Sequence, residues 1–350
     1  MKIAPGSTIG ILGGGQLGKM MVLAASKLGY KTVVYSNAED SPAFDVANEK
    51  ILDSYENVTS LERFASLCDV ITVEFENIPY QTALALEKRV TFRPNPRSLF
   101  ISQNRIREKS FVQTLGIDTT PFIEVTDLTD AIEAIGTPCI LKTAEFGYDG
   151  KGQIKIDQET DLPSLSNSGG ILEKLIPFQM EISVVAARGL NGEFVPYTPV
   201  QNVHRDGILD TTIAPAEISE ELGRKAVEVT KTLMEALEYI GILAVEFFVT
   251  QEDELLVNEF APRPHNSGHW TIDACCTCQF EQHIRAICGL SLGNPDYHCT
   301  AVMRNLIGKS IHDWPQILMD KNDKLHIYGK KSIKPGRKMG HVTRLNKNAT

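Results

Sequence analysis

Two glutamates on neighbouring apolar stretches carry the clearest chemical signal in this chain. Glu246 lies in LAVEFFV and Glu259 lies in LLVNEFAPR. A hairpin that turns symmetrically about Glu252 and Asp253 places the two carboxylates directly opposite each other, where they repel unless one is protonated or a cation lies between them. Oxygen ligands on a rigid hairpin, completed by nucleotide phosphates, are typical of a Mg²⁺–ATP site. The alternative is an ion pair between Glu259 and Arg263 with Glu246 partly exposed, but the apolar flanks favour the metal.

The stretch LKTAEFGYDGKGQ, at 141–153, has the composition of a phosphate-binding loop. Lys142 ends an apolar strand. The loop that follows holds Gly147, Tyr148, Asp149, Gly150, Lys151 and Gly152. Glycines let backbone amides approach phosphate oxygens, and the two lysines supply positive charge. The residue order is not that of a P-loop. A polar hairpin with a solvated lysine stays open as an alternative.

The loop APRPHNSGHW, at 261–270, follows Glu259 directly and is crowded with polar side chains. They are Arg263, His265, Asn266, Ser267 and His269. Prolines and a glycine favour a fixed loop, which is the usual place for groups that bind substrate. We therefore expect a substrate site beside the proposed metal, although one or two of these histidines can be structural.

Two further segments are weaker candidates for ligand binding. The stretch ILEKLIPFQME, at 171–181, can hold a nucleotide base through backbone hydrogen bonds while Glu181 binds ribose hydroxyls, but its residues alone favour an amphipathic connector. The stretch KKSIKPGRK, at 330–338, has five Lys or Arg in nine residues. An acidic protein needs such local charge to hold a nucleotide monophosphate, and we expect Lys334 and Arg337 to do so. A solvated surface patch is the alternative.

The N-terminal stretch ILGGGQLGKM contains Gly13, Gly15 and Gly18 at the spacing of a dinucleotide-binding turn. The amides that open the following helix would suit a phosphate. An NAD site should have an acidic residue at the end of the next strand, yet the strand at 31–35 runs into Ser36 and Asn37. A phosphate-binding or purely structural turn is therefore favoured over an NAD site.

Composition narrows the class of protein. The chain has 350 residues, 42% of them hydrophobic, and a formal net charge of -9. This acidity argues against a general binder of nucleic acid or of anionic membranes. The seven cysteines are irregularly spaced and imply no disulfide framework. No secretory segment or apolar run of bilayer length is present, so we expect a cytoplasmic protein with no membrane partner.

The elements that must position these residues change in type along the chain. The first 93 residues alternate strand and helix, which predicts a parallel α/β sheet. We expect its strands at 8–12, 31–35 and 70–75, a helix at 16–28, a linker at 93–98, and a second helix that begins at Ser98 and ends at Leu115. Strands then dominate, including a hairpin across Asn191 and Gly192, and one long helix spans 219–238. The fold class is α/β followed by α+β.

Taken together, the motifs resemble the ATP-grasp superfamily, and within it the N5-carboxyaminoimidazole ribonucleotide synthetase family. The matching stretches are GILGGGQLGKM, DVITVEFENIP, GYDGKGQ, NVHRDGILDTTIAPA, NEFAPRPHNSGHWTIDA and KPGRKMGH. The resemblance implies a Rossmann-like pre-ATP-grasp domain (1–97), an ATP-grasp domain (98–295) and a small β-rich C-terminal part (296–350). It implies carboxylation of 5-aminoimidazole ribonucleotide with bicarbonate and ATP, with Mg²⁺ or Mn²⁺ as the metal and a homodimeric assembly.

The resemblance also assigns residues. The nucleotide positions are Arg105, Lys142, the loop 147–152, Glu173, Lys174, Leu175, Ile176, Glu181, His204, Asn258 and Glu259, and the metal positions are Glu246 and Glu259. The substrate positions are Glu76, Tyr148, His265, Asn266, Lys334 and Arg337, and the catalytic positions are Lys142, Arg263, His265 and Asn266. No NAD is expected.

The sequence departs from the family pattern in two places and leaves rival functions open. Phe146 stands where such loops often have a glycine, and the chain stops soon after GRKMGHVTR, so the C-terminal part is expected to be short of a native tail. The nearest rival is a formate-dependent glycinamide ribonucleotide transformylase, which shares PRPH but not the NSGH that follows. An NAD-dependent oxidoreductase and a non-catalytic nucleotide-binding regulator are the other two.

Overall fold

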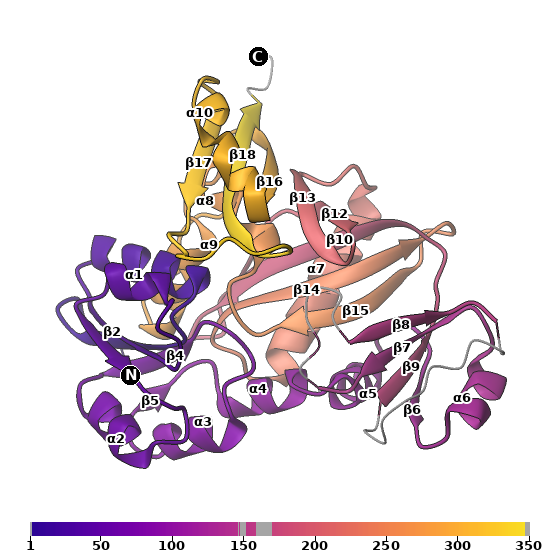
Figure 1. Cartoon of the computed structure of the whole chain (residues 1–350), viewed down its shortest axis with the longest axis horizontal. Helices are drawn as coiled ribbons and strands as arrows, with labels where there is room; N and C mark the ends of the chain where they lie inside the picture. The colour runs from indigo at the N-terminus through magenta and orange to yellow at the C-terminus, as the bar shows by residue number, and fades with distance from the viewer. Residues whose placement is uncertain (1, 146, 148–151, 159–169, 347–350) are drawn as a thin grey trace.

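The computed structural model of the chain describes residues 2–145, 147, 152–158 and 170–346, and its elements form three β-sheets (Figure 1). The first sheet is parallel, with the strand order β3-β2-β1-β4-β5. Its strands are β1 (Thr8–Leu12), β2 (Lys31–Ser36), β3 (Glu49–Leu52), β4 (Val70–Val73) and β5 (Thr91–Phe92). The helices around it are α1 (Gln16–Lys27), α2 (Val58–Ser66) and α3 (Tyr80–Glu87), with a 3₁₀ turn η1 (Pro42–Asp45). The predicted parallel α/β unit is confirmed, and β3 and β5 are strands that the sequence pattern missed.

The glycine turn between β1 and α1 surrounds a carboxylate of the protein itself. The backbone amides of Gly15 and Gly18 donate to the two oxygens of Glu74, at 2.6 and 2.7 Å. A Cβ atom on Gly13 would lie 2.2 Å from Cγ of Glu74, so only glycine fits there. Because Glu74 already accepts from these two amides, the structure supports the structural interpretation of this turn.

Two short helices, not one, follow the N-terminal sheet. They are α4 (Pro96–Ser102) and α5 (Arg105–Thr114). The prediction that Ser98 begins a single helix is wrong, because Asn95 is the N-cap and accepts from the Ser98 amide while Pro96 occupies the first turn. Proline is well suited to that position, since its missing N–H would have no helical partner. Asn104 caps α5 in turn, which separates the two helices.

The central part of the chain forms a small antiparallel sheet and most of a large one. The small sheet has the order β6-β9-β7-β8. Its elements are β6 (Phe122–Val125), α6 (Leu128–Ile135), β7 (Cys139–Thr143), β8 (Gln153–Ile156) and β9 (Gly170–Lys174). This part of the chain contributes the following strands to the large sheet: β10 (Phe178–Arg188), β11 (Phe194–Pro196), β12 (Val200–Arg205), β13 (Ile208–Ala214), β14 (Gly241–Thr250) and β15 (Leu255–Ala261). The predicted hairpin across Asn191 and Gly192 joins β10 to β11.

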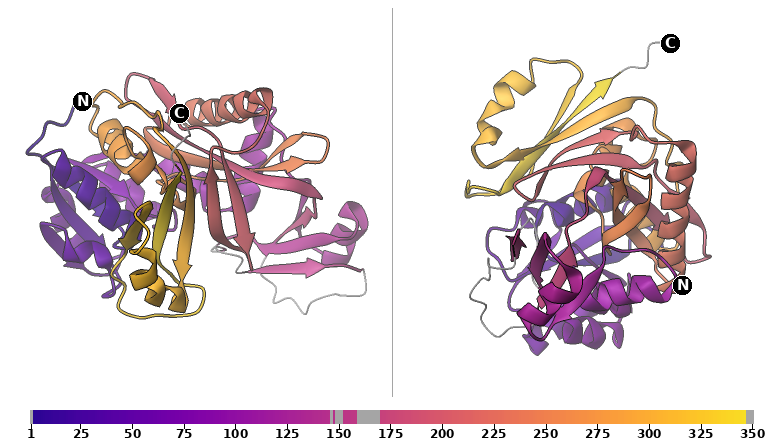
Figure 2. Two further views of the ribbon diagram at one scale, coloured as in Figure 1. Left: turned by 90° about the horizontal axis from the view of Figure 1, so that it is seen from above. Right: turned by 90° about the vertical axis from the view of Figure 1, so that its right-hand side faces the viewer.

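The C-terminal strands continue the large sheet. They are β16 (Thr300–Ile307), β17 (Asp323–Ile327) and β18 (Lys338–Asn346), and β16 pairs with β13. In both views of Figure 2 they lie beside β12 and β13. The remaining helical segments are α7 (Glu220–Ala236), η2 (Asn266–Gly268), α8 (Thr271–Ala274), α9 (Gln279–Ile287), η3 (Gly308–Asp313) and α10 (Trp314–Ile317). Within the described residues, no helix is both long and apolar enough to cross a bilayer.

Alternation along β10 assigns the two faces of the large sheet. Ile182 and Val184 belong to the apolar core that α7 covers, together with Val245 of β14. Side chains of successive residues in a strand point to opposite faces, so Glu181 and Ser183 lie on the other face. One face of the sheet therefore packs against α7, while the other carries polar groups at Glu181 and Ser183 and a second apolar cluster that includes Val185 and Ala187.

Candidate active site

A cavity of about 1150 Å³ lies where the N-terminal sheet, the two central sheets and the segment 330–338 meet. Its wall includes most of the residues predicted for nucleotide, metal and substrate, which are Glu76, Arg105, Lys142, Gly147, Glu181, His204, Glu246, Asn258, Glu259, Arg263, His265, Asn266, Lys334 and Arg337. The other described candidates, Gly152, Glu173, Lys174, Leu175 and Ile176, lie outside this wall. Tyr148, Asp149, Gly150 and Lys151 lie outside the described residues.

Glu246 and Glu259 are cross-strand partners on β14 and β15, as predicted. The predicted reason is only partly right. Near the turn the pairs are Val249 with Leu255 and Phe247 with Val257, so the hairpin turns about Glu252 itself. A β-bulge between Glu246 and Phe247 gives β15 one extra residue, and this brings Glu259 back opposite Glu246.

The extra residue in the bulge is Asn258, and it supplies a third oxygen. Asn258 lines the cavity with Glu246 and Glu259. Its Oδ1 atom is buried and has no hydrogen-bond partner in the described structure. Buried polar atoms are almost always paired, so an unpaired oxygen on a residue that lines the cavity is a candidate ligand atom once the side chain turns toward the cavity. Within the described residues, no cluster of three or more His, Cys, Asp or Glu side chains forms a metal site by itself.

Three residues from the first turns of α5 hold the bulged segment of β15. Arg105 Nη1 lies 2.8 Å from Glu259 Oε2. Glu108 Oε1 accepts from the Phe260 amide at 2.7 Å, and Lys109 Nζ donates to the Asn258 carbonyl at 3.0 Å. Burial and the nearby Glu259 carboxylate raise the pKa of Glu108 to about 8. The helix α5 therefore contacts the backbone on both sides of Glu259 and also the Glu259 side chain.

Lys142 reaches the cavity from β7 and is paired with a buried carboxylate. Its Nζ lies 2.9 Å from Oε2 of Glu173, and Nζ of Lys109 lies 3.5 Å from the same oxygen. Burial alone would raise the pKa of Glu173, but the two lysines outweigh it and hold that pKa at about 2. Glu173 itself lies outside the cavity wall, and its direct contact with nucleotide stays a prediction.

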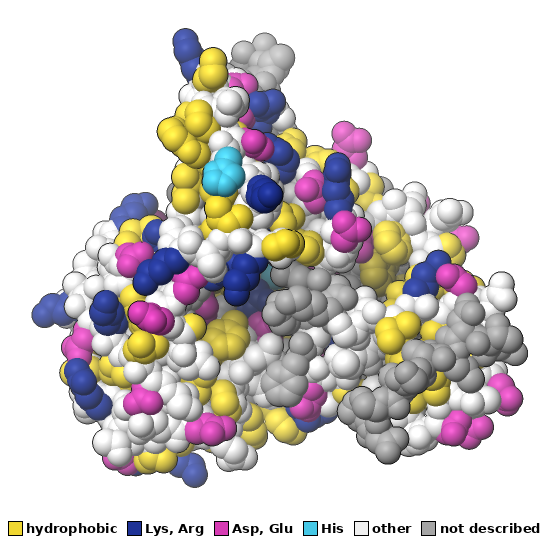
Figure 3. Space-filling model, in the orientation of Figure 1, with side chains coloured by type: hydrophobic (Ala, Val, Ile, Leu, Met, Phe, Trp, Pro, Cys, Tyr) yellow, Lys and Arg dark blue, Asp and Glu magenta, His cyan; other side chains and the backbone are white. Residues whose placement is uncertain are grey.

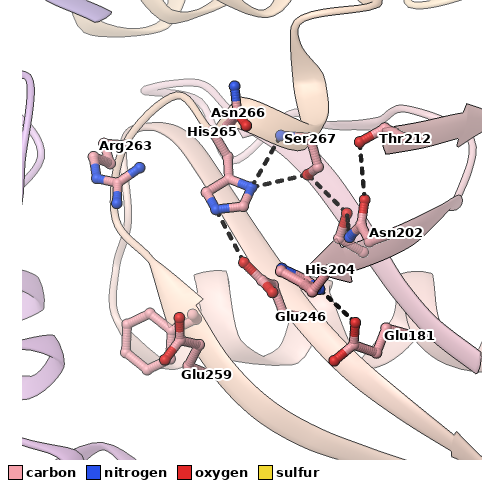
Figure 4. A network of polar contacts seen from close by, with 12 residues as sticks. Glu181, Asn202, His204, Thr212, Glu246, Glu259, Arg263, His265, Asn266 and Ser267 are labelled. Atoms are coloured by element: carbon pink, nitrogen blue, oxygen red, sulfur yellow. Dashed lines mark hydrogen bonds and ion pairs between the residues drawn. The ribbon is translucent and has the colours of Figure 1, made fainter. Parts of the chain in front are cut away.

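His204 and Glu181 lie side by side in the wall and form a hydrogen-bonded pair (Figure 4). Burial lowers the pKa of His204, but the Glu181 hydrogen bond and the charges of Glu246 and Glu181 outweigh burial and raise it. His265 Nε2 lies 3.0 Å from Glu246 Oε1. Burial would raise the pKa of Glu246, yet His265 and His204 together hold it at about 2. Glu246 is therefore ionised at neutral pH and available as a ligand.

Arg263 does not pair with Glu259. Its guanidinium is bound by both carboxylate oxygens of Glu76, with Nη2 3.2 Å from Oε1, so the loop after β15 is tied to the loop after β4. The predicted alternative to a metal, an ion pair of Glu259 with Arg263, is therefore wrong. Asn266 Nδ2 donates to Asn305 Oδ1 of β16 at 3.0 Å.

The basic segment 330–338 forms one side of the cavity. In Figure 3, Lys and Arg side chains gather where the C-terminal strands meet the N-terminal sheet. Lys334 and Arg337 both line the cavity, and Arg337 Nη1 lies 2.8 Å from Asp40 Oδ2. Asp40 also accepts from the Lys331 amide at 2.9 Å, so this segment is anchored to the N-terminal unit.

Sequence reasoning missed Asp40, Glu108 and Lys109. Each makes its key contact with a residue more than 100 positions away. The stretch RIREKS reads as an ordinary exposed helix, because charged residues are rarely fully buried. Nothing in its spacing distinguishes Glu108 and Lys109, which are buried, from Arg107, which is partly exposed.

Comparison with known proteins agrees with this architecture. Residues 6–103 match the ribonucleotide synthetase preATP-grasp domain, residues 110–280 match the ATP-grasp domain, and residues 301–350 match the phosphoribosylaminoimidazole carboxylase C-terminal domain. The chain is 46% identical to the N5-carboxyaminoimidazole ribonucleotide synthase of Brucella melitensis, over 98% of this chain and 97% of that protein. It is 43% identical to that of Bacillus subtilis, over 97% of this chain and 92% of that protein.

Solved structures give the same result. A crystal structure of an N5-carboxyaminoimidazole ribonucleotide synthetase as an ADP complex is 44% identical, with a TM-score of 0.96 over 99% of this chain and 94% of that chain. The enzyme from Aspergillus clavatus in complex with ADP and 5-aminoimidazole ribonucleotide is 28% identical, with a TM-score of 0.90 over 97% and 94% of the two chains. The chain is therefore an ATP-grasp ligase that belongs to the N5-carboxyaminoimidazole ribonucleotide synthase family.

Proposed function

We propose that this chain carboxylates 5-aminoimidazole ribonucleotide with bicarbonate, at the expense of ATP, to give N5-carboxyaminoimidazole ribonucleotide, ADP and phosphate in purine biosynthesis. The observation that carries the proposal is the single cavity. Its wall combines facing acids, a buried lysine and a basic segment. Such a cavity can hold a triphosphate, a metal and a second phosphorylated substrate together.

The chemistry follows from the properties of bicarbonate, which is a poor electrophile. Its oxygen attacks the γ-phosphate of ATP, so carboxyphosphate forms and ADP leaves. Lys142 neutralises charge on the transferred phosphoryl group. Carboxyphosphate, or the CO₂ it releases, then meets the exocyclic amine of the substrate. Arg263, held by Glu76, is a fixed cation in the wall of the same cavity.

Glu246, Glu259 and Asn258 would hold a divalent cation, Mg²⁺ or Mn²⁺ in its place. Carboxylate and amide oxygens are the donors that these hard cations prefer, and the unpaired Asn258 Oδ1 fits the same set. When bound, the cation neutralises charge on the nucleotide phosphates. Three donors leave coordination positions for phosphate oxygens and water. Metal affinity should therefore be high only when nucleotide is present.

The substrate side comprises Glu76, His265, Asn266, Lys334 and Arg337, with Tyr148 from the glycine loop. We assign the substrate phosphate to Lys334 and Arg337, which line the cavity together with Lys330 and Lys338 of the same anchored basic segment. We also propose domains at 1–97, 98–295 and 296–350, a homodimer, and a cytoplasmic location.

The decisive experiment measures ADP release by the purified protein with ATP and Mg²⁺. ADP release that requires both 5-aminoimidazole ribonucleotide and bicarbonate supports the proposal. ADP release that requires glycinamide ribonucleotide and formate would identify the transformylase reaction instead. Tight NADH binding without ATP turnover would favour an oxidoreductase.

A further inference from the structure

A chain of buried polar side chains runs beneath the cavity and ends at His265 (Figure 4). Thr212 Oγ1 donates to Asn202 Oδ1 at 3.1 Å, and Asn202 Nδ2 donates to Ser183 Oγ at 2.9 Å. Ser183 Oγ then donates to Ser267 Oγ at 2.8 Å. The four side chains come from β13, β12, β10 and η2, and each is at most 4% exposed.

The last link of the chain meets the imidazole of His265. Ser267 Oγ lies 2.8 Å from His265 Nδ1, and the Ser267 backbone amide donates to the same nitrogen at 3.3 Å. An amide N–H can only donate, so Nδ1 must offer its lone pair. The proton of the neutral ring then resides on Nε2, the nitrogen that lies 3.0 Å from Glu246 Oε1.

The hydrogen bonds of the whole chain agree with this assignment. With Nδ1 as an acceptor, each hydroxyl and the Asn202 amide donate in one direction, from Thr212 toward His265. Each of the three hydroxyls and the Asn202 amide then donates to an acceptor within the chain or on His265, which favours this arrangement in a buried site. The opposite direction would leave the Ser267 amide and a protonated Nδ1 facing each other.

We propose that Asn202, Ser183 and Ser267 are positioning residues that fix His265 as its Nε2–H tautomer, so that His265 donates to Glu246. The donation engages Oε1 of Glu246 and leaves Oε2 for the cation that the proposed function requires. Hydrogen bonds of this kind behind a ligand set its orientation and its basicity. His265 acts in this arrangement through Glu246, and not as an acceptor of protons from substrate at Nδ1.

Nitrogen-15 NMR of protein with labelled histidines tests the assignment directly, because protonated and unprotonated ring nitrogens have distinct shifts. The His265 signals are identified by their loss in His265→Gln. The expected result is an unprotonated Nδ1 and a protonated Nε2 in the wild type. A protonated Nδ1 in the neutral ring would overturn the proposal.

Two nearly isosteric variants test the role of the chain. Asn202→Asp removes the donor in the middle, so the hydroxyl of Ser183 turns to the new carboxylate and Ser267 turns toward Ser183. The oxygen of Ser267, 2.8 Å from Nδ1 of His265, then favours a proton on Nδ1 and competes with the Ser267 amide, which is farther away at 3.3 Å. Thr212→Val removes only the far end and keeps the direction of the remaining bonds.

The readout is Mn²⁺ binding in the presence of ADP, measured by electron paramagnetic resonance without turnover. We expect Asn202→Asp to weaken Mn²⁺ affinity about tenfold or more, and Thr212→Val to change it by less than about twofold. Equal losses in both variants would show that the chain only supports packing. If Asn202→Asp does not fold, Ser267→Ala should weaken Mn²⁺ binding and Ser267→Thr should restore it. A failure of Thr to restore binding would contradict the proposal.

This inference rests on the proposed function only in one respect: it takes Glu246 as a ligand of the cation that binds with the nucleotide. Wild-type protein that lacks ADP release with 5-aminoimidazole ribonucleotide, but shows the expected tautomer and Mn²⁺ affinities, would refute the substrate and keep the chain. Wild-type protein with full activity and a protonated Nδ1 would refute the role of the chain and keep the proposed substrate.

Discussion

Glu259 lies opposite a second carboxylate, and a nearby cation offsets the repulsion between the two. A carboxylate opposite Glu246 would by itself be destabilising, and Arg105 offsets this with an ion pair at 2.8 Å. We therefore expect Glu259→Gln to abolish ADP release and to lower the free energy of unfolding by about 1 kcal/mol, because Arg105 loses its partner. Urea unfolding and an ADP assay check the two effects. Glu252→Gln, at the exposed turn of the same hairpin, is the control and should change neither. A rise in stability would mean that repulsion outweighs the ion pair.

Arg337 is the second residue whose role can be separated from folding. We expect Arg337→Ala to raise the KM for 5-aminoimidazole ribonucleotide about tenfold, the scale of one charge-assisted hydrogen bond, with the KM for ATP nearly unchanged. Arg344→Ala is the matched control, because Arg344 is an exposed arginine of β18 that pairs with Asp323 and does not line the cavity. Equal changes in both KM values would point to a general disturbance of the cavity.

At the scale of elements, α5 connects the small sheet, which carries Lys142, with strand β15, which carries Glu259. Lys109 donates to Thr120 Oγ1 at 2.7 Å and to the Asn258 carbonyl at 3.0 Å, and it lies beside Glu173. Burial lowers the pKa of Lys109 although Glu173 opposes this effect. The helix therefore depends on one buried cation to reach both the small sheet and β15.

We expect Lys109→Met to lower the free energy of unfolding by about 3–5 kcal/mol, since it removes one partner from a buried charge network. The variant should also raise the KM for ATP for two reasons. Glu173 then keeps Lys142 as its remaining lysine partner, and the bulge at Asn258 loses the hydrogen bond from Lys109. Denaturant unfolding and steady-state kinetics measure the two effects. The control is Lys225→Met, an exposed lysine of α7. An unchanged KM for ATP would reduce Lys109 to a purely structural role.

At the scale of the whole molecule, buried histidines attach the C-terminal strands to the rest of the chain. His341 of β18 lies 4.8 Å, between ring centroids, from His269, and 4.5 Å from His326. His326 Nε2 is 2.8 Å from Asp273 of α8. Burial holds the pKa values of His269 and His341 well below the ordinary range, so both stay neutral in the fold.

Acid should therefore destabilise the protein through these two histidines. The unfolded chain takes up protons on His269 and His341 below a pH of about 6.5, while the folded chain does not. The contribution of these two groups to the free energy of unfolding is therefore fully present above that pH and is lost as the pH falls. We expect the free energy of unfolding to fall by up to about 1.4 kcal/mol per pH unit for each group. His341→Asn should make the dependence shallower without removing it, because His269 and the buried His283, whose pKa burial lowers to about 3, still contribute. His312→Gln, at an exposed site, should leave it unchanged. A wild-type stability that is constant between pH 7.5 and about 5 would contradict this.

Much of the site could be predicted from the sequence because local patterns report on it. The apolar strands around Glu246 and Glu259 predict a hairpin, and the density of donors after Pro264 predicts a loop that binds a ligand. The hairpin is confirmed, and residues of the loop line the same cavity as the two glutamates, whereas ligand binding by the loop stays a prediction. The hairpin turn itself was misplaced by one residue, because a β-bulge at Asn258 has no signature in residue type.

The sequence by itself determined the α/β and α+β fold class, the main order of strands and helices, and most of the proposed site residues that line the cavity, because periodicity, turn residues and motif order are local properties. Only the tertiary structure decided which charges pair. Arg263 joins Glu76, Arg105 joins Glu259, and Glu74 fills the glycine turn that resembles a cofactor site. Partners of this kind lie 56 to 187 positions apart. Burial strengthens each pairing, and which of several equivalent charges meet depends on how three sheets are packed, which no spacing along the chain records.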